Sequence, residues 1–166
     1  MLENEEIERK RNWQYHCGSV DKIKNGLNNQ KNKTMEKIRT HFICRKQIKK
    51  GRSGSRELVK NFKEGSSIAL MIDQRVREGI SVPFFQKSCS TTTIPAQLVK
   101  KYECEIVPIY IERKKNHFFE MTVSQPLVFN KSLSIDDISV ELNKILEKMI
   151  LKNLDQWIWT HNRWQK

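Results

Sequence analysis

His16 and Asp21 are the two residues of the chain whose types and spacing suit acid–base chemistry. They stand in an H-x4-D arrangement. A carboxylate that holds an imidazole can make it a general base for a hydroxyl nucleophile. This spacing also occurs often by chance. We therefore take His16 as a candidate catalytic base and Asp21 as its candidate orienting carboxylate.

A second polar group follows an apolar run. Ser67–Ile72 is typical of a buried central strand, and Asp73, Gln74 and Arg75 come directly after it. In open α/β sheets, ligand sites gather at the carboxyl ends of the strands. We predict that these three side chains contact substrate at that edge. Alternatively, Asp73 caps the next turn.

Two further segments suit anionic ligands. The loop Arg45–Arg56 mixes basic residues with glycine and serine, and Arg52 and Arg56 could each bind a phosphate bidentately. Thr92 lies in a hydroxyl-rich turn, Ser88–Thr93, ahead of a predicted helix. Helix amino termini hold anions, but a threonine there also serves as a simple N-cap. A solvated basic loop and a structural cap are the alternatives.

The elements that must position these residues follow from hydrophobic periodicity. Helical spacing is found in Thr34–Phe42, Ser55–Gly65, a segment starting near Pro95, and Ile135–Leu151. Strand patterns are found in Ser67–Ile72, Ile80–Phe85, Glu105–Glu112 and Phe118–Ser124. Strands alternating with helices predict an α/β domain over 34–166, with a central mixed sheet flanked by helices. Met1–Lys33 is predicted to be poorly ordered or a remnant segment.

The chain ends in a tail rich in tryptophan. Trp157, Trp159 and Trp164 surround His161 and Arg163. Tryptophan and arginine together suit a membrane–water boundary, or they can pack on the sheet as a lock. We predict the packing role, with His161 and Arg163 as the polar rim of the packed rings.

Composition limits the partners. The 166 residues contain 31 Lys and Arg against 19 Asp and Glu, a formal charge of +12. Such a surface attracts polyanions: nucleic acid, an anionic membrane, or a phosphorylated glycolipid. No apolar run approaches the roughly 20 residues of a spanning helix. The four cysteines form no C-x-x-C pair, so we expect free thiols and no metal site.

Six ordered blocks together resemble the bacterial lipid A biosynthesis (lauroyl/myristoyl) acyltransferase family. The resemblance covers roughly Asn28 to Lys166, and its strongest parts are the Asp73-Gln74 strand end and the W-x-H-x-R-W ending. The six blocks are Lys50–Lys60, Gly65–Gln74, Val82–Phe85, Thr91–Ala96, Ile106–Pro108 and Trp157–Trp164.

The resemblance implies an acyltransferase-like α/β fold and a reaction. An acyl thioester on acyl-carrier protein would be attacked by a hydroxyl of a lipid A precursor, a phosphorylated glucosamine disaccharide. Members use an H-x4-D/E pair as base and orienting carboxylate, and need no metal or organic cofactor. The cationic surface would suit the acidic carrier protein, the lipid phosphates and an anionic membrane surface. The implied location is the cytoplasmic face of the bacterial inner membrane, with this chain peripheral.

The sequence departs from the family in three places. The family's amino-terminal region, with its membrane anchor and first strand, has no counterpart. Gln86 stands where the family has glycine after Phe-Phe. The catalytic H-x-x-N-W-E context is echoed by Asn12-Trp13-Gln14, with Arg9 in the histidine position. We interpret the chain as truncated at the amino terminus. Either His16 and Asp21 replace the pair imperfectly, or the chain is an inactive remnant or half of a split enzyme.

The rival class is a small basic nucleic-acid-binding protein. Charge and aromatic residues favour it. However, the cationic residues are spread over many segments rather than gathered on one recognition helix. We therefore expect no nucleic-acid partner and keep this class as the alternative.

Overall fold

The computed structural model describes residues 13–16, 33–34, 37–38, 40–42, 48, 52–76, 78–160 and 162–164, with backbone alone for 13–16, 52 and 53. The chain divides into two compact units, Met1–Met71 and Ile72–Lys166. The predicted boundary at residue 33 remains a prediction. Asp21 lies outside the described residues. No helix in the described segments is long and apolar enough to cross a membrane.

Among its described residues, the first unit contains a parallel strand pair and helix α3 (Arg52–Lys63), and residues 33–34, 37–38 and 40–42, within or beside the predicted helix Thr34–Phe42, are also helical. Strand β1 (Trp13–His16) runs parallel to β2 (Ser67–Leu70), and His16 is the register partner of Leu70. Helix α3 buries Leu58 and ends before Gly65, whose φ of 86° is left-handed, as is common just after a helix. The helix begins at Arg52 rather than near Ser55. The end of the predicted basic loop is therefore helical.

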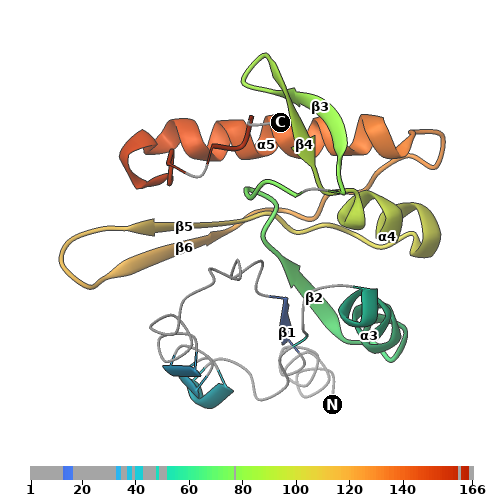
Figure 1. Ribbon diagram of the computed structural model, residues 1–166, viewed down its shortest axis with the longest axis horizontal. Coiled ribbons are helices and arrows are strands. Elements are labelled where there is room, and N and C mark those ends of the chain that lie inside the picture. The colour runs from blue at the N-terminus through green and yellow to red at the C-terminus, as the bar shows by residue number, and fades with distance from the viewer. Residues whose placement is uncertain are drawn as a thin grey trace. The chain divides into compact units, whose positions relative to one another are not determined.

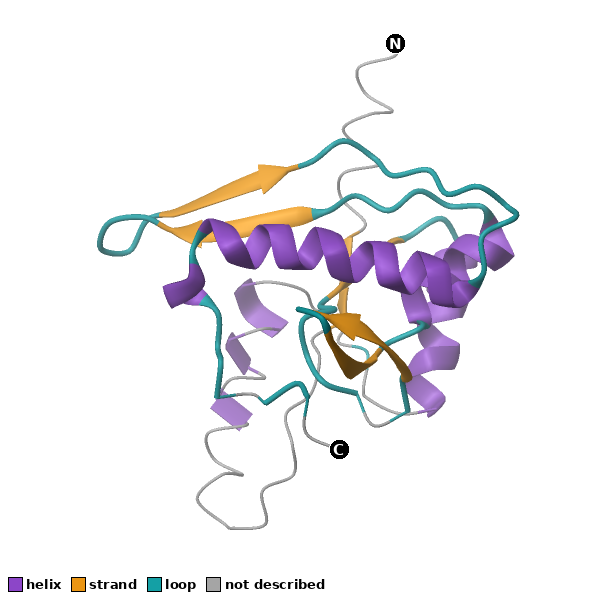
Figure 2. Cartoon of the chain, turned by 90° about the horizontal axis from the view of Figure 1, so that it is seen from above, coloured by secondary structure: helices purple, strands orange, loops and turns teal. Residues whose placement is uncertain are grey.

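The second unit contains two antiparallel hairpins and two helices (Figure 1). Its elements, in chain order, are β3 (Ile80–Phe84), β4 (Lys87–Thr91), α4 (Ile94–Tyr102), β5 (Ile109–Arg113), β6 (Phe119–Val123), α5 (Ile135–Lys152) and the 3-10 helix η1 (Leu154–Gln156). The β5–β6 hairpin runs alongside α5, and β3–β4 packs against the same helix (Figures 1 and 2).

The predicted elements of this unit are confirmed, with two exceptions. The strand predicted at Glu105–Glu112 begins four residues later, as β5, and only an isolated bridge between Ile106 and Leu127 precedes it. The prediction of a hydroxyl-rich turn at Ser88–Thr93 is wrong, because Lys87–Thr91 forms strand β4, which pairs with β3. Cys89 and Thr91 are buried, while Ser88 is exposed and Ser90 half-buried. This alternation is typical of a strand with one buried face. The short polar side chains concealed that pattern.

The sheets are smaller than predicted. In the described segments the strands form three two-stranded sheets, β1–β2, β3–β4 and β5–β6. This mixture of helices and strands is consistent with an α/β protein. A central mixed sheet flanked by helices is not confirmed.

Two apolar clusters hold the second unit together. The first joins α4 to α5 through Ala96, Val99, Ile138 and Leu142. The second surrounds Phe84, Cys89 and Ile150, and it includes Trp157 and Trp164 from the tail. The predicted packing of the tail is confirmed for these two tryptophans.

Gly79 is required where the chain enters the β3–β4 hairpin. A Cβ atom there would lie 2.4 Å from the backbone oxygen of Thr91 and 2.8 Å from Oγ of Ser90. Ser90 Oγ also donates a hydrogen bond to the carbonyl of Val76 across this approach. The segment after Asp73 thus lies directly against β4.

The β3–β4 turn is strained at two residues. Phe85 and Gln86 have φ values of 48° and 62°, and Phe84 pairs with Lys87 across them. A two-residue hairpin loop with both φ angles positive is a type I′ turn, which favours asparagine and glycine. Glu147 on α5 accepts a 2.6 Å hydrogen bond from the backbone N–H of Phe85. This bond helps to hold the strained turn.

Replacing Gln86 with glycine should therefore stabilise the chain. The left-handed conformation costs a non-glycine residue about 1–2 kcal/mol, and part of that gain is offset by the chain entropy of glycine. We expect Gln86→Gly to raise the free energy of unfolding by about 0.5–1 kcal/mol in urea denaturation. The matched control is Gln97→Gly on α4, which should lower it by about 1 kcal/mol. A destabilised Gln86→Gly variant would contradict the strained turn.

The amino terminus of α5 predicts a pH effect. Ser134 and Asp137 form a capping box, in which the hydroxyl and backbone N–H of Ser134 donate to the Asp137 carboxylate. These bonds lower the pKa of Asp137 below its ordinary 3.8. Because the pKa is lowered, the ionised carboxylate stabilises the fold above pH 3.8. This stabilisation is lost as the pH falls from 3.8 through the lowered pKa of the folded protein. Asp137→Asn should thus be less stable than wild type at pH 7, with the difference shrinking in acid.

Urea midpoints of both proteins across this pH range measure the effect. The matched control is Asp136→Asn, one residue earlier in the same first turn and outside the box. A pH-independent difference between wild type and Asp137→Asn would show that the carboxylate charge plays no part.

Candidate functional site

A fully buried arginine forms the polar centre of the second unit. Arg163 has no solvent-exposed surface, and neither does Asn143 on α5. Thr91, the last residue of β4, is 2% exposed. Burying a guanidinium is unfavourable unless hydrogen bonds or an opposite charge compensate it. The contacts of Arg163 therefore decide whether this arrangement is stable.

Arg163 joins the tail to β4 and α5. Its Nη2 donates to Oδ1 of Asn143 at 2.9 Å and to Oγ1 of Thr91 at 3.2 Å. Asn143 Nδ2 in turn donates to Thr91 Oγ1 and to the carbonyl of Pro83. Sγ of Cys89 lies 3.4 Å from the same threonine oxygen. One network thus fixes both strands of the hairpin, the helix and the tail.

Aromatic rings enclose this network on one side. The guanidinium carbon of Arg163 lies 4.1 Å from the ring centroid of Phe84, a cation–π contact. Trp164 stacks on Phe84 at 5.5 Å, and Trp157 meets Phe84 edge-on at 5.8 Å. Nε1 of Trp164 donates to the carbonyl of Phe84 at 3.0 Å. The rings exclude water from one side of the charged group.

The polar centre still has unfilled hydrogen-bonding capacity. Nε and Nη1 of Arg163 and Oδ1 of Asp73 are buried and have no hydrogen-bond partner among the described residues. Burial lowers the pKa of Arg163, and the nearby Cys89, Asp73 and Glu147 act in the opposite direction. Asp73 thus supplies an opposite charge near the buried guanidinium without a direct hydrogen bond.

A small open pocket lies beside this centre. It has a volume of about 360 Å³ and is lined by Phe85, Lys87, Asn162 and Trp164. Its two aromatic side chains can contact a sugar ring or an acyl chain, and its amide and ammonium groups can bind a negatively charged group of the same ligand. The pocket draws its residues from the β3–β4 turn and the tail, which Arg163 holds together.

The structure brings together four of the six sequence blocks. Asp73, the Pro83-Phe84-Phe85 run, Thr91 and the Trp157–Trp164 ending all contribute to the buried centre or its aromatic wall. Within the second unit, these blocks form one connected arrangement.

The predicted site residues have different outcomes. Asp73, Gln74 and Arg75 are half-buried, and Oδ1 of Asp73 has no hydrogen-bond partner among the described residues. Thr92 lies one residue before Thr93, the N-cap of α4, and its Oγ1 accepts a 3.3 Å hydrogen bond from the backbone N–H of Ile94. Their contact with substrate remains a prediction.

The remaining predicted residues belong to the first unit. Arg56 is exposed on α3. Arg52 and His16 lie at the start of α3 and the end of β1, with side chains outside the described part. Asp21 is likewise outside it. The catalytic roles of His16 and Asp21 remain predictions.

One prediction about the tail was wrong. Arg163 was expected to lie on a polar rim around the tryptophans, but it is fully buried. Sequence reasoning also missed Asn143, which lies on the apolar stripe of α5. A polar residue at a core position of that stripe was the one available sign of a buried partner.

Two comparisons with known proteins bear on this arrangement. A family model described as bacterial lipid A biosynthesis acyltransferase matches residues 20–166. A search of curated proteins found no match. The family match covers nearly the whole chain, including every block that forms the polar centre.

The buried network predicts that Arg163 is a major stabilising residue. Arg163→Met should lower the free energy of unfolding by about 2–4 kcal/mol, because Asn143, Thr91 and Asp73 lose a buried partner. The matched control is Arg113→Met, since Arg113 also lies over a phenylalanine ring but is exposed. Its effect should stay within about 0.5 kcal/mol. Equal urea midpoints for the two variants would refute the role given to Arg163.

Proposed function

Because the chain belongs to the bacterial lipid A biosynthesis acyltransferase family, we propose that it transfers a fatty acyl chain from acyl-carrier protein to a hydroxyl of a lipid A precursor. The observation that carries this proposal is the family match over 20–166. The convergence of four family-like blocks on one buried centre supports it.

In the proposed reaction, a lipid hydroxyl oxygen attacks the carbonyl carbon of the acyl thioester. The carbon–sulfur bond breaks, an ester forms, and the carrier protein leaves as a thiol. His16 takes the hydroxyl proton and returns it to the departing sulfur, while Asp21 orients the imidazole. The atoms balance without a metal or organic cofactor.

The strand pairing of the first unit supports a role for His16. It is the last residue of β1 and pairs with Leu70, the last residue of the parallel strand β2. Both positions are therefore at the carboxyl ends of parallel strands, where catalytic and binding residues of α/β proteins gather. The chain reaches Asp73 three residues after Leu70.

The start of α3 supports phosphate binding. Arg52 and Arg56 are four residues apart, so their positions share one side of the helix. The first turn of α3 has no acidic residue, and a helix amino terminus favours an anion. We propose that both arginines contact the phosphates of the lipid A precursor, with Gln74, Arg75 and Thr92 as further substrate contacts.

Charge supports the proposed partners. Met1–Met71 holds 17 of the 31 Lys and Arg residues but 8 of the 19 Asp and Glu residues, so it carries +9 of the formal +12. Such a surface attracts an acidic carrier protein, lipid phosphates and an anionic membrane. We propose that the chain works at the cytoplasmic face of the inner membrane.

A transfer assay tests the proposal. The intact chain, given acyl-carrier protein loaded with a fatty acid and a detergent-dispersed lipid A precursor, should form an acylated product detectable by mass spectrometry. His16→Ala should reduce the rate about 10²–10⁴-fold, because the general base is lost. The matched control, His41→Ala, removes an exposed histidine of the same unit and should retain the wild-type rate.

Equal rates for wild type and His16→Ala would remove His16 from the mechanism. Absence of product from a correctly folded wild-type chain would contradict the proposed activity and favour an inactive remnant.

A further inference from the structure

The β5–β6 hairpin has two chemically different faces. Side chains on paired strands alternate between faces, so register partners share a face. Tyr110, Glu112, Glu120 and Thr122 form the first face. Ile109, Ile111, Arg113, Phe119, Met121 and Val123 form the second, which is apolar apart from Arg113.

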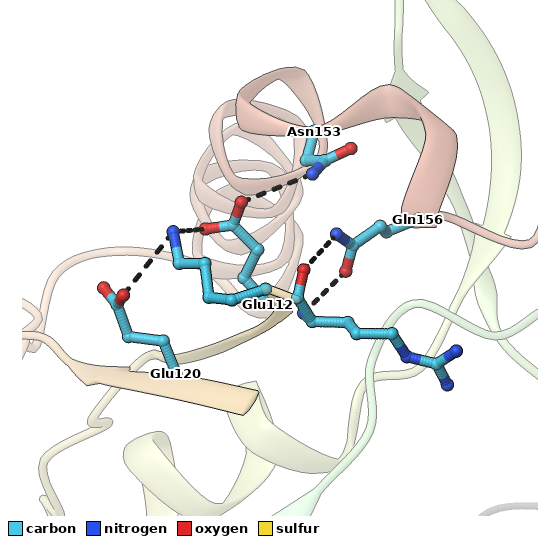
Figure 3. Close-up of polar contacts among 6 residues, drawn as sticks. Glu112, Glu120, Asn153 and Gln156 are labelled. Carbon is cyan, nitrogen blue, oxygen red and sulfur yellow. Dashed lines mark hydrogen bonds and ion pairs between the residues drawn. The ribbon is translucent and has the colours of Figure 1, made fainter. Parts of the chain in front are cut away.

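The first face is engaged with the end of α5. Asn153 Nδ2 donates to Oε1 of Glu112 at 3.3 Å, and Nζ of Lys152 lies 5.2 Å from the ring centroid of Tyr110. Figure 3 shows Glu112 turned toward Asn153 at the carboxyl end of the helix. This face therefore has its partner within the second unit.

The second face, which we call the apolar hairpin face, has no such cover within the second unit. Exposed fractions are 53% for Ile111, 59% for Phe119, 62% for Met121 and 56% for Val123, and Phe118 beside them is 73% exposed. A contiguous exposed patch of this kind marks a surface that contacts another protein or a membrane.

The free edge of β5 is already blocked near the turn. Gln156 accepts a 2.7 Å hydrogen bond from the backbone N–H of Arg113 and donates one of 2.7 Å to its carbonyl (Figure 3). A side chain that occupies these groups hinders pairing with another strand at that point. This observation disfavours a second copy added edge-to-edge.

The charges around the turn favour an anionic partner. Lys114 pairs with both carboxylates of the hairpin, Glu112 at 2.7 Å and Glu120 at 3.5 Å. Arg113 and Lys115 pair with no carboxylate among the described residues, and Arg113 lies over the Phe119 ring at 5.2 Å. The turn thus combines neutralised acids, available cations and exposed phenylalanines. This combination suits the headgroup boundary of an anionic bilayer.

We propose that the apolar hairpin face inserts into the interface of an anionic lipid bilayer. The inference deepens the proposed function, because the acyl chains of a lipid A precursor hold it in a membrane. The apolar side chains would enter the acyl boundary, and Arg113 and Lys115 would contact lipid phosphates. Because insertion requires neither the acyl donor nor the acyl acceptor, it can be measured separately from acyl transfer.

Vesicle flotation tests this surface on the full chain. The probes are vesicles of phosphatidylethanolamine with phosphatidylglycerol, and vesicles of phosphatidylcholine alone. High salt screens the electrostatic attraction between the basic first unit and the vesicle surface, so binding measured at high salt reports mainly apolar insertion. Wild type should float with the anionic vesicles and bind phosphatidylcholine less.

The double variant Phe119→Thr with Met121→Thr should lower the partition coefficient at high salt by about tenfold or more, because two inserted apolar side chains are lost. Threonine retains strand propensity, and an unchanged circular dichroism spectrum confirms folding. The matched control is Val128→Thr, an apolar residue that is 79% exposed outside the hairpin and should bind like wild type.

Oxidation of Met121 by peroxide gives an independent readout. Met121 should oxidise readily in the free chain and be protected by anionic vesicles. Protection in the free chain would mean that protein covers the face, and would overturn the proposal. Unchanged flotation of the double variant would overturn it too. Because the transfer assay uses detergent-dispersed acceptor, a wild-type chain that transfers the acyl group but does not float with anionic vesicles would reject this surface and leave the enzymatic proposal intact.

Discussion

The buried guanidinium of Arg163 is the constraint on which the second unit depends. A charge without solvent contact must be compensated by the protein itself. Here the compensation comes from Asn143 and Thr91 by hydrogen bonds, from the face of the Phe84 ring, and from the nearby charge of Asp73. These groups come from four separate parts of the chain. The arginine can be buried only when all four are in place, so it makes their assembly cooperative.

Helix α5 provides the common support for this assembly. Asn143, Glu147 and Ile150 recur at spacings of four and three, and therefore lie along one face of the helix. Asn143 bonds the polar centre, Glu147 holds the strained turn at Phe85, and Ile150 packs in the aromatic cluster. A single helix face thus supports the hairpin and the tail together. The capping box at Ser134 and Asp137 fixes where that helix begins.

Sequence periodicity predicted the helices and most strands because their apolar residues recur at short, fixed intervals. Strand β4 was missed because cysteine, serine and threonine give little contrast between its buried and exposed faces. The burial of Arg163 was missed for a different reason. Its partners Asn143 and Thr91 are 20 and 72 residues away, and local spacing carries no information about such contacts. Four blocks could be recognised separately, but only the fold shows that they converge.

The same limit applies to Gln86 and to the β5–β6 hairpin. The departure from glycine at Gln86 was visible in the sequence, but its cost follows from the positive φ that the type I′ turn imposes. The alternation in β5 and β6 predicted two faces without saying which one is covered. Because Asn153 and Lys152 engage the face with Tyr110 and Glu112, the apolar face is the one left open within the second unit. Electrostatic attraction and apolar contact consequently reside mainly in different units, with most of the net positive charge in Met1–Met71 and this large apolar face in Ile72–Lys166. A lipid that is both phosphorylated and acylated requires both kinds of contact, which is the chemical reason a protein acting on it would retain both surfaces.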